Sequence, residues 1–296
     1  MRTTTIEVNV GIGARPDRVF GALLDSSDLQ AWFAESAGTS VRGRQYNFWG
    51  RTTPEAPGLD ESHHELVDVQ RDRKLSYRWK LRGADTRVDV TLEPDGSHTR
   101  VVLVHDDAPA RRVEEGSLAD WWGLSLENLK AWVERGRTGL KVDFTIPPEL
   151  ELRLEIDVEA KRALVFRALI DPKQIERWIG EPGHTAVEPR VGGRLDFGWG
   201  SEGGGPIRIL SLQPDRELSY AWIYGQEPET AVTWSLVDSN GGTHVTLVHL
   251  GFVDTIHDRP YRTGWTKFLN RVKHMVESGA SWKRAITVSH DYEVAR

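Results

Sequence analysis

The strongest feature of this sequence is an internal duplication, in which the second half repeats the first. The clearest repeated run is DRKLSYRW at 72–79, which returns as DRELSYAW at 215–222. Further matches join 10–32 to 156–178, and 122–136 to 265–279. The shift between copies changes only between matched runs, where loops are expected to differ in length. A period of about half the chain indicates two copies of one domain, not a short-repeat solenoid.

Both copies predict the same order of elements, β-α-α-β-β-β-β-β-β-α. Polar and apolar residues alternate in 6–12 and in 152–158, which is typical of a strand with one buried face. In the second copy, Asp171 is the expected N-cap of the second helix. Pro94-Asp95-Gly96 and Asn240-Gly241 are turn signals that favour antiparallel hairpins.

Each copy ends in a long amphipathic helix. Its apolar stripe is Trp122, Leu126, Leu129 and Val133 in one copy and Trp265, Leu269, Val272 and Val276 in the other. Gly136 and Gly279 stand where helix-terminating glycines belong. The order predicts an α+β fold, a curved antiparallel sheet around the long helix, which leaves room for a cavity between them. We expect the first domain in 1–137, the second in 142–280 and a C-terminal tail in 281–296.

Charge and composition exclude several classes of partner. The net charge is −6 and no block of Lys or Arg is present, which argues against a nucleic-acid or anionic-membrane partner. No segment approaches the roughly 20 apolar residues of a membrane span, and the first residues lack the pattern of a signal peptide. The absence of cysteine removes disulfides, thiolate nucleophiles and Cys-ligated metals. We therefore expect a cytoplasmic protein without membrane insertion; the oligomeric state stays open.

The opening Arg15-Pro16-Asp17-Arg18-Val19-Phe20-x-Ala22-Leu23, the Gly-Arg pair before Trp49 and the final Trp-x-x-x-Leu-x-x-Leu helix carry a family resemblance. They resemble the SRPBCC superfamily, and within it the domain of the activator of the heat-shock chaperone. The resemblance covers nearly the whole chain as two units. It implies two tandem helix-grip domains of the START or birch-pollen-allergen type. The superfamily includes lipid carriers, ligand binders, polyketide aromatases and cyclases, and enediyne self-resistance proteins. Since it has no shared catalytic motif, no residue is carried over as catalytic.

Aromatic and histidine residues, most of them at matched positions, are the candidate ligand-binding residues. They are Trp49, Tyr77, Trp79, His105, Trp122, Trp199, Tyr220, Trp222, Tyr224, Trp234, His249 and Trp265. The aromatic side chains could line two pockets in which a flat ligand stacks, or they could simply fill the interior. His105 and His249 could act as acid–base groups, although a structural role with satisfied hydrogen bonds is the favoured interpretation.

No metal or cofactor is expected. His63 and His64, with Glu61 and Glu65 beside them, lie in the loop 51–65, but adjacent His side chains in such a loop point apart and no second pair has metal-ligand spacing. A loop at the mouth of a pocket is the better interpretation. Nucleophile-elbow, zinc-protease and dinucleotide-binding motifs are also absent from the sequence.

The main functional hypothesis is binding of an apolar, polycyclic aromatic small molecule, without catalysis. The setting would be natural-product biosynthesis, sequestration or self-resistance, with enediyne-type self-sacrifice as a special case. The first alternative is a polyketide cyclase or aromatase in which His or Tyr moves protons. The second is a chaperone-interacting module. Which copy binds is left open, because the longer loop favours the first and the Trp- and Tyr-rich strand favours the second.

Overall fold

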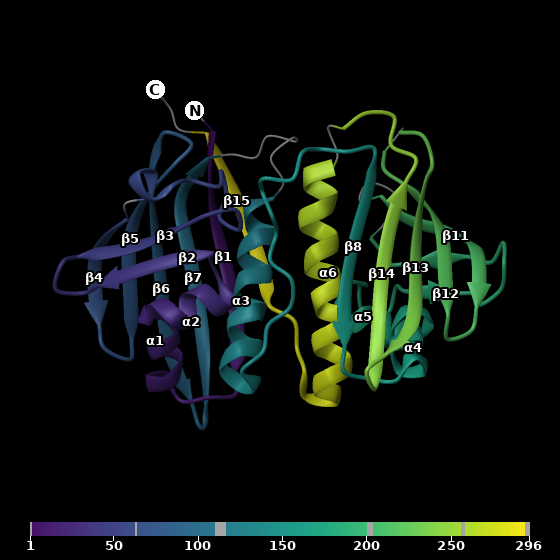
Figure 1. Ribbon diagram of the computed structural model, residues 1–296, viewed down its shortest axis with the longest axis horizontal. Coiled ribbons are helices and arrows are strands. Elements are labelled where there is room, and N and C mark those ends of the chain that lie inside the picture. The colour runs from purple at the N-terminus through teal and green to yellow at the C-terminus, as the bar shows by residue number, and fades with distance from the viewer. Residues whose placement is uncertain are drawn as a thin grey trace. The chain divides into compact units, whose positions relative to one another are not determined.

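The computed structural model describes residues 2–62, 64–109, 117–199, 204–225, 227–255 and 258–293. The chain divides into two compact units, Met1–Pro147 with Ala285–Arg296, and Pro148–Arg284. Each unit has the predicted order of elements, and in each the long helix lies along an antiparallel sheet (Figure 1). The predicted α+β class is therefore confirmed.

The first unit is built on an antiparallel sheet in the order β15-β1-β7-β6-β5-β4-β3-β2. Its strands are β1 (Arg2–Ile12), β2 (Ser36–Ser40), β3 (Gln45–Trp49), β4 (Glu65–Gln70), β5 (Lys74–Leu81), β6 (Ala84–Asp95), β7 (His98–Pro109) and β15 (Ile286–Glu293). Its helices are α1 (Pro16–Leu24), α2 (Ser26–Trp32), the short 3-10 helix η1 (Leu59–Glu61) and α3 (Leu118–Arg135).

The second unit has a five-stranded antiparallel sheet in the order β11-β12-β13-β14-β8, and a separate pair, β10-β9. Its strands are β8 (Glu151–Val158), β9 (Ala186–Val187), β10 (Leu195–Asp196), β11 (Gly205–Gln213), β12 (Glu217–Ile223), β13 (Thr230–Ser239) and β14 (Gly242–Leu250). Its helices are α4 (Arg162–Ile170), α5 (Pro172–Trp178), α6 (Asp258–Ser278) and the short 3-10 helix η3 (Gly279–Ser281).

Local sequence signals fix where the helices begin and end. The carboxylate of Asp171 accepts a hydrogen bond from the backbone N–H of Lys173, which caps α5 as predicted. Gly136 and Gly279 follow α3 and α6 with φ angles of 66° and 69°. This left-handed conformation costs glycine little, because it has no Cβ.

The C-terminal segment that we expected to be a tail is a strand of the first unit. β15 (Ile286–Glu293) pairs antiparallel with β1, with Thr287 opposite Val8. At its start, the backbone N–H of Ala285 donates to the Glu127 carboxylate of α3 at 2.9 Å. A comparison of the two copies could not predict this pairing, because β1, the strand with which β15 pairs, lies at the other end of the sequence.

The boundary between the two units also differs from the expected one. Residues 142–147 belong to the first unit, although we expected the second domain to begin at 142. Val142 is buried, and the backbone N–H of Phe144 donates to the carbonyl of Arg51 at 2.8 Å. These contacts hold the end of the connection against the first unit.

Two matched tryptophans anchor the short helices to the core. Trp32 and Trp178 are both buried, and their indole N–H groups donate to the carbonyls of Ala22 and Ala168 at 2.9 and 2.8 Å. Buried indoles need such a partner. Both tryptophans are therefore part of the core of their unit.

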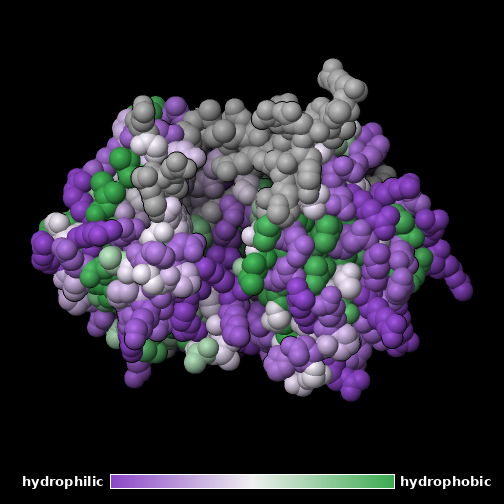
Figure 2. All heavy atoms as spheres, turned by 180° about the vertical axis from the view of Figure 1, so that it is seen from behind, coloured by the Kyte–Doolittle hydropathy of each residue, from purple (hydrophilic) through white to green (hydrophobic). Residues whose placement is uncertain are grey.

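Among the described residues, none of the helices is both long and apolar enough to span a bilayer. Most of the face seen in Figure 2 is hydrophilic, with smaller hydrophobic areas between.

Candidate functional site

A buried hydrogen-bond network surrounds His105 of β7. The indole N–H of Trp122 donates to His105 Nδ1 at 3.0 Å, and His105 Nε2 lies 2.9 Å from Thr86 Oγ1. The Thr86 hydroxyl in turn donates to the carbonyl of Trp79 at 2.6 Å. Because an indole nitrogen can only donate, Nδ1 carries no proton and the neutral ring holds its proton on Nε2. Both ring nitrogens are therefore used inside the protein.

The second unit repeats this network at matched positions. The indole N–H of Trp265 donates to His249 Nδ1 at 3.1 Å, and His249 Nε2 lies 2.8 Å from Thr230 Oγ1. The Thr230 hydroxyl donates to the carbonyl of Trp222 at 3.3 Å. The tautomer of His249 follows by the same argument. The repeat thus preserves a hydrogen-bonded network as well as a pattern of residue types.

The electrostatics of both histidines favour a structural role. Burial lowers the pKa of His105 and of His249 to about 3, because a charged imidazole loses its solvation in the interior. Each ring is therefore neutral near pH 7, and neither nitrogen is left to take a proton from a ligand. This arrangement supports the structural interpretation over acid–base chemistry.

In the first unit, aromatic side chains pack tightly around Trp79. The Trp79 ring centroid lies 5.3 Å from that of Phe48, 5.4 Å from His105 and 5.9 Å from Trp121. We call the following set the first aromatic cluster, and each of its members is at most 4% exposed: Phe33, Tyr46, Phe48, Tyr77, Trp79, Trp121 and Trp122. The interior of the first unit is filled by its own side chains at this point.

In the second unit, an equivalent cluster surrounds Trp222. Its ring centroid lies 5.1 Å from that of Trp265 and 5.9 Å from that of Trp199, and its indole N–H donates to the Tyr261 hydroxyl at 3.0 Å. Tyr220 and Trp234 are fully buried behind it, joined by a 3.0 Å hydrogen bond from the Trp234 indole to the Tyr220 hydroxyl.

The second cluster differs from the first in that one edge reaches solvent. Four of its aromatic side chains are only half-buried, and we call them the aromatic edge: Trp199, Phe252, Tyr261 and Phe268. Phe252 and Tyr261 stack with their centroids 5.4 Å apart, and Trp199 and Phe268 lie 6.1 Å apart. A flat apolar molecule could add to these exposed ring faces without displacing the core.

Most of the predicted site residues gather in these two clusters, but two do not. Trp49 follows the fully buried Phe48 on β3, so it lies on the opposite face of the strand and is half-buried there. Tyr224 lies beyond the end of β12 and is 44% exposed. Phe48, and not Trp49, is the residue of β3 that packs into the first cluster.

The sequence analysis missed several residues of the clusters. They are Phe33, Tyr46, Phe48, His64 and Trp121 in the first unit and Phe197, Phe252, Tyr261 and Phe268 in the second. A signal existed for part of the second set, because Tyr261, Trp265 and Phe268 have the i, i+4, i+7 spacing of one helix stripe. The loop aromatics offered no such periodicity.

The histidine pair of the loop 51–65 gives no support for a metal site. His63 lies outside the described residues, and the His64 ring stacks on Phe48 with centroids 3.9 Å apart. Within the described part of the chain, no group of three or more His, Cys, Asp or Glu residues could hold a metal ion.

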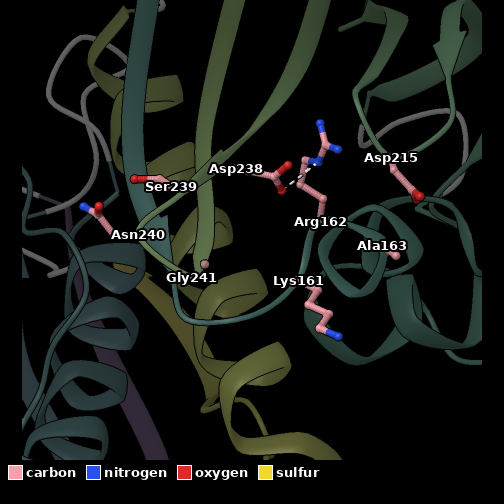
Figure 3. A pocket seen from close by; sticks show the side chains of 9 residues that line it. Lys161, Arg162, Ala163, Asp215, Asp238, Ser239, Asn240 and Gly241 are labelled. Carbon is pink, nitrogen blue, oxygen red and sulfur yellow. Dashed lines mark ion pairs between the residues drawn. The ribbon is translucent and has the colours of Figure 1, made fainter.

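A separate polar pocket of about 430 Å³ lies in the second unit (Figure 3). It is lined by the start of α4, the β11–β12 turn and the β13–β14 hairpin: Lys161, Arg162, Ala163, Asp215 and Asp238–Gly242. Arg162 Nε and Asp238 Oδ1, which point toward each other in Figure 3, lie 3.0 Å apart. This pocket shares no residue with the second aromatic cluster, and its mixed charges do not suit an apolar ligand.

The fold and the two aromatic interiors define a tandem helix-grip protein. The model of the family described as Activator of Hsp90 ATPase homolog 1-like protein matches residues 13–134 and 159–277. The chain belongs to this family, which confirms the resemblance drawn from its sequence. A comparison with curated proteins gave no match.

Solved structures that are similar to this chain include the following three. DynU16, from the dynemicin biosynthetic locus, is 18% identical, with 93% of this chain and 98% of that chain covered and a TM-score of 0.36. CalU16 from Micromonospora echinospora is 24% identical, with coverages of 44% and 76% and a TM-score of 0.38. The Aha1 dimer from Colwellia psychrerythraea is 21% identical, with coverages of 45% and 100% and a TM-score of 0.40.

Proposed function

We propose that the protein binds a flat, apolar, aromatic small molecule at the aromatic edge of the second unit, and that it acts there as a binding protein rather than as an enzyme. The observation that carries this proposal is the contrast between the clusters. Every ring of the first aromatic cluster is buried, whereas Trp199, Phe252, Tyr261 and Phe268 keep part of their surface open. Exposed apolar surface on a soluble protein often marks a binding site.

Among the described residues at this edge, the histidine and the tyrosine are poorly suited to catalysis, which supports binding without chemistry. Both nitrogens of His249 are engaged by Trp265 and Thr230. Burial raises the pKa of Tyr261 to about 12, so its hydroxyl stays protonated near pH 7 and is a poor base. A cyclase mechanism that relies on His249 or Tyr261 to remove a proton is therefore disfavoured.

The proposed biological settings share one step, which is binding of the ligand. Biosynthesis, sequestration and self-resistance of a polycyclic natural product each begin with binding of that molecule, and this step is what we propose. A chaperone-interacting role has the family description as its support, and binding of a chaperone in a pull-down would favour it.

The first test is a fluorescence titration with 1,8-dihydroxyanthraquinone, a neutral planar probe. We expect saturable quenching of tryptophan emission, because the probe would lie against Trp199 and Trp222. Replacing Phe268 by Ser, the residue type at the matching position 125 of the first unit, should weaken binding by about 1–2 kcal/mol, roughly 5- to 30-fold, through loss of aromatic contact.

The matched control is Tyr46→Phe, which alters the first aromatic cluster and keeps its ring. Binding by this variant should equal that of the unaltered protein. If neither the anthraquinone nor other planar polycyclic probes quench saturably, the aromatic edge is not a ligand site and the proposed function is wrong.

A further inference from the structure

We infer that one helix position, occupied by Trp121 in the first unit and by Gly264 in the second, determines that the second unit alone takes a planar ligand. The ligand's ring system would lie where the indole of Trp121 lies in the first unit. This inference rests on the proposed function and specifies the position and size of the site.

The equivalence of the two positions follows from the histidine networks. Trp122 of α3 and Trp265 of α6 donate to the same atom, Nδ1, of His105 and His249. The residues just before them, Trp121 and Gly264, therefore occupy the same place on equivalent helices.

Trp121 fills the interior of the first unit. Its ring centroid lies 4.6 Å from that of Trp122, 5.2 Å from Phe33 and 5.9 Å from Trp79, and its indole N–H donates to the carbonyl of Thr52 at 3.3 Å. The side chain is 3% exposed. The first unit thus supplies its own planar ring at this point, held between other rings and by a hydrogen bond.

Neither packing nor backbone geometry explains the glycine of the second unit. A Cβ built on Gly264 would meet one side-chain atom within 4 Å, Cε2 of Phe268, at an ordinary contact distance of 4.0 Å. Its φ is not in the left-handed region that favours glycine. A glycine inside a helix is unfavourable compared with alanine. Its consequence here is that no side chain extends from α6 at the position just before Trp265.

At a second position, too, an aromatic residue of the first unit is replaced by a non-aromatic residue in the second. Phe33, which contacts Trp121, is the C-cap residue of α2, and Ile179 is the C-cap residue of α5. The second unit therefore has an aliphatic side chain and a glycine where the first has two aromatic rings in contact. Phe268, one turn after Gly264, and Trp199 cover part of this region but stay half-buried.

These observations give the size and shape of the ligand. In the first unit the Trp121 indole lies against Trp79 and Trp122, so a ligand ring in its place would lie against the equivalent Trp222 and Trp265. The ligand should contain a planar apolar ring system at least as large as an indole. Long flexible chains lack this planar match, and fatty acids should bind more weakly than 1,8-dihydroxyanthraquinone.

The experiment measures affinity and stoichiometry with the anthraquinone probe for the full chain and two variants. The unaltered protein should bind one probe per chain. Gly264→Trp should weaken binding at least tenfold, because the new indole takes the ligand's place, whereas the control Tyr46→Phe, which lies in the first unit, should bind like the unaltered protein. Trp121→Gly should open the first unit and raise the stoichiometry toward two.

The outcomes separate this inference from the proposed function. Absence of binding by the unaltered protein would overturn both. Binding that Gly264→Trp leaves intact, or two sites in the unaltered protein, would overturn the assignment of position 264 while the binding function stands. If Gly264→Trp does not fold, as circular dichroism would show, Gly264→Leu fills the same space with a smaller side chain and the same criteria apply.

Discussion

At the residue scale, the two buried histidines make the fold sensitive to acid. Their pKa in the folded protein is about 3, whereas an unfolded histidine titrates near 6.5, so the unfolded chain takes up these protons first. The stability tied to each neutral ring is complete above about pH 6.5. It is lost progressively as the pH falls from about 6.5 toward 3.

We therefore predict that the free energy of unfolding falls by roughly 2 kcal/mol per histidine when the pH is lowered from about 7.5 to about 5. The measurement is urea unfolding at both pH values. His249→Gln should be less stable at both, because a buried network is disturbed, yet its loss between the two values should be about 2 kcal/mol smaller than that of the unaltered protein. An unchanged pH dependence would contradict the role assigned to His249.

A second prediction at this scale concerns Gly264. Because a Cβ fits there without a close contact, Gly264→Ala should raise the free energy of unfolding by about 0.5–1 kcal/mol through helix propensity. Chemical denaturation of the variant checks this value. A destabilised Gly264→Ala would mean that the glycine is needed for packing and would weaken the case for open space.

At the element scale, β15 makes the first unit depend on the last residues of the chain. It pairs with β1 over eight residue positions, from Arg2–Glu293 to Asn9–Ile286. Without it, β1 becomes an open strand edge, which promotes aggregation as well as loss of stability.

We predict that a chain ending at Arg284 loses roughly 2–4 kcal/mol of stability in the first unit, from several backbone hydrogen bonds and the contact of Ala285 with Glu127. Limited proteolysis with mass spectrometry should then find new cleavage sites within Arg2–Ile12 and few in the second unit. The matched control is Ile286→Ser, a change on a side chain that is 64% exposed, which should leave cleavage unaltered. Equal protection of β1 in the truncated chain would show that β15 adds little.

At the scale of the whole molecule, duplication lets the two copies of one domain diverge. Both keep the buried network of histidine, tryptophan and threonine, which specifies the interior. The first copy completes its interior with Trp121, and the second keeps Gly264 and an aromatic edge that reaches solvent. These few substitutions are the basis of the division that we propose between a closed first unit and a ligand-binding second unit.

The sequence by itself determined the duplication, the order of elements and the α+β class, because these depend on local periodicity, capping residues and matched runs. Its repeated aromatic and histidine positions also indicated most of the residues that pack around Trp79 and Trp222, although not Trp49 or Tyr224. Tertiary structure decided the rest. The side on which Trp49 lies depends on strand register, the pairing of β15 depends on a distant open edge, and the contrast between Trp121 and Gly264 acquires meaning only when both helices are placed against their sheets. Each of these is a contact between residues far apart in the chain, which local patterns do not encode.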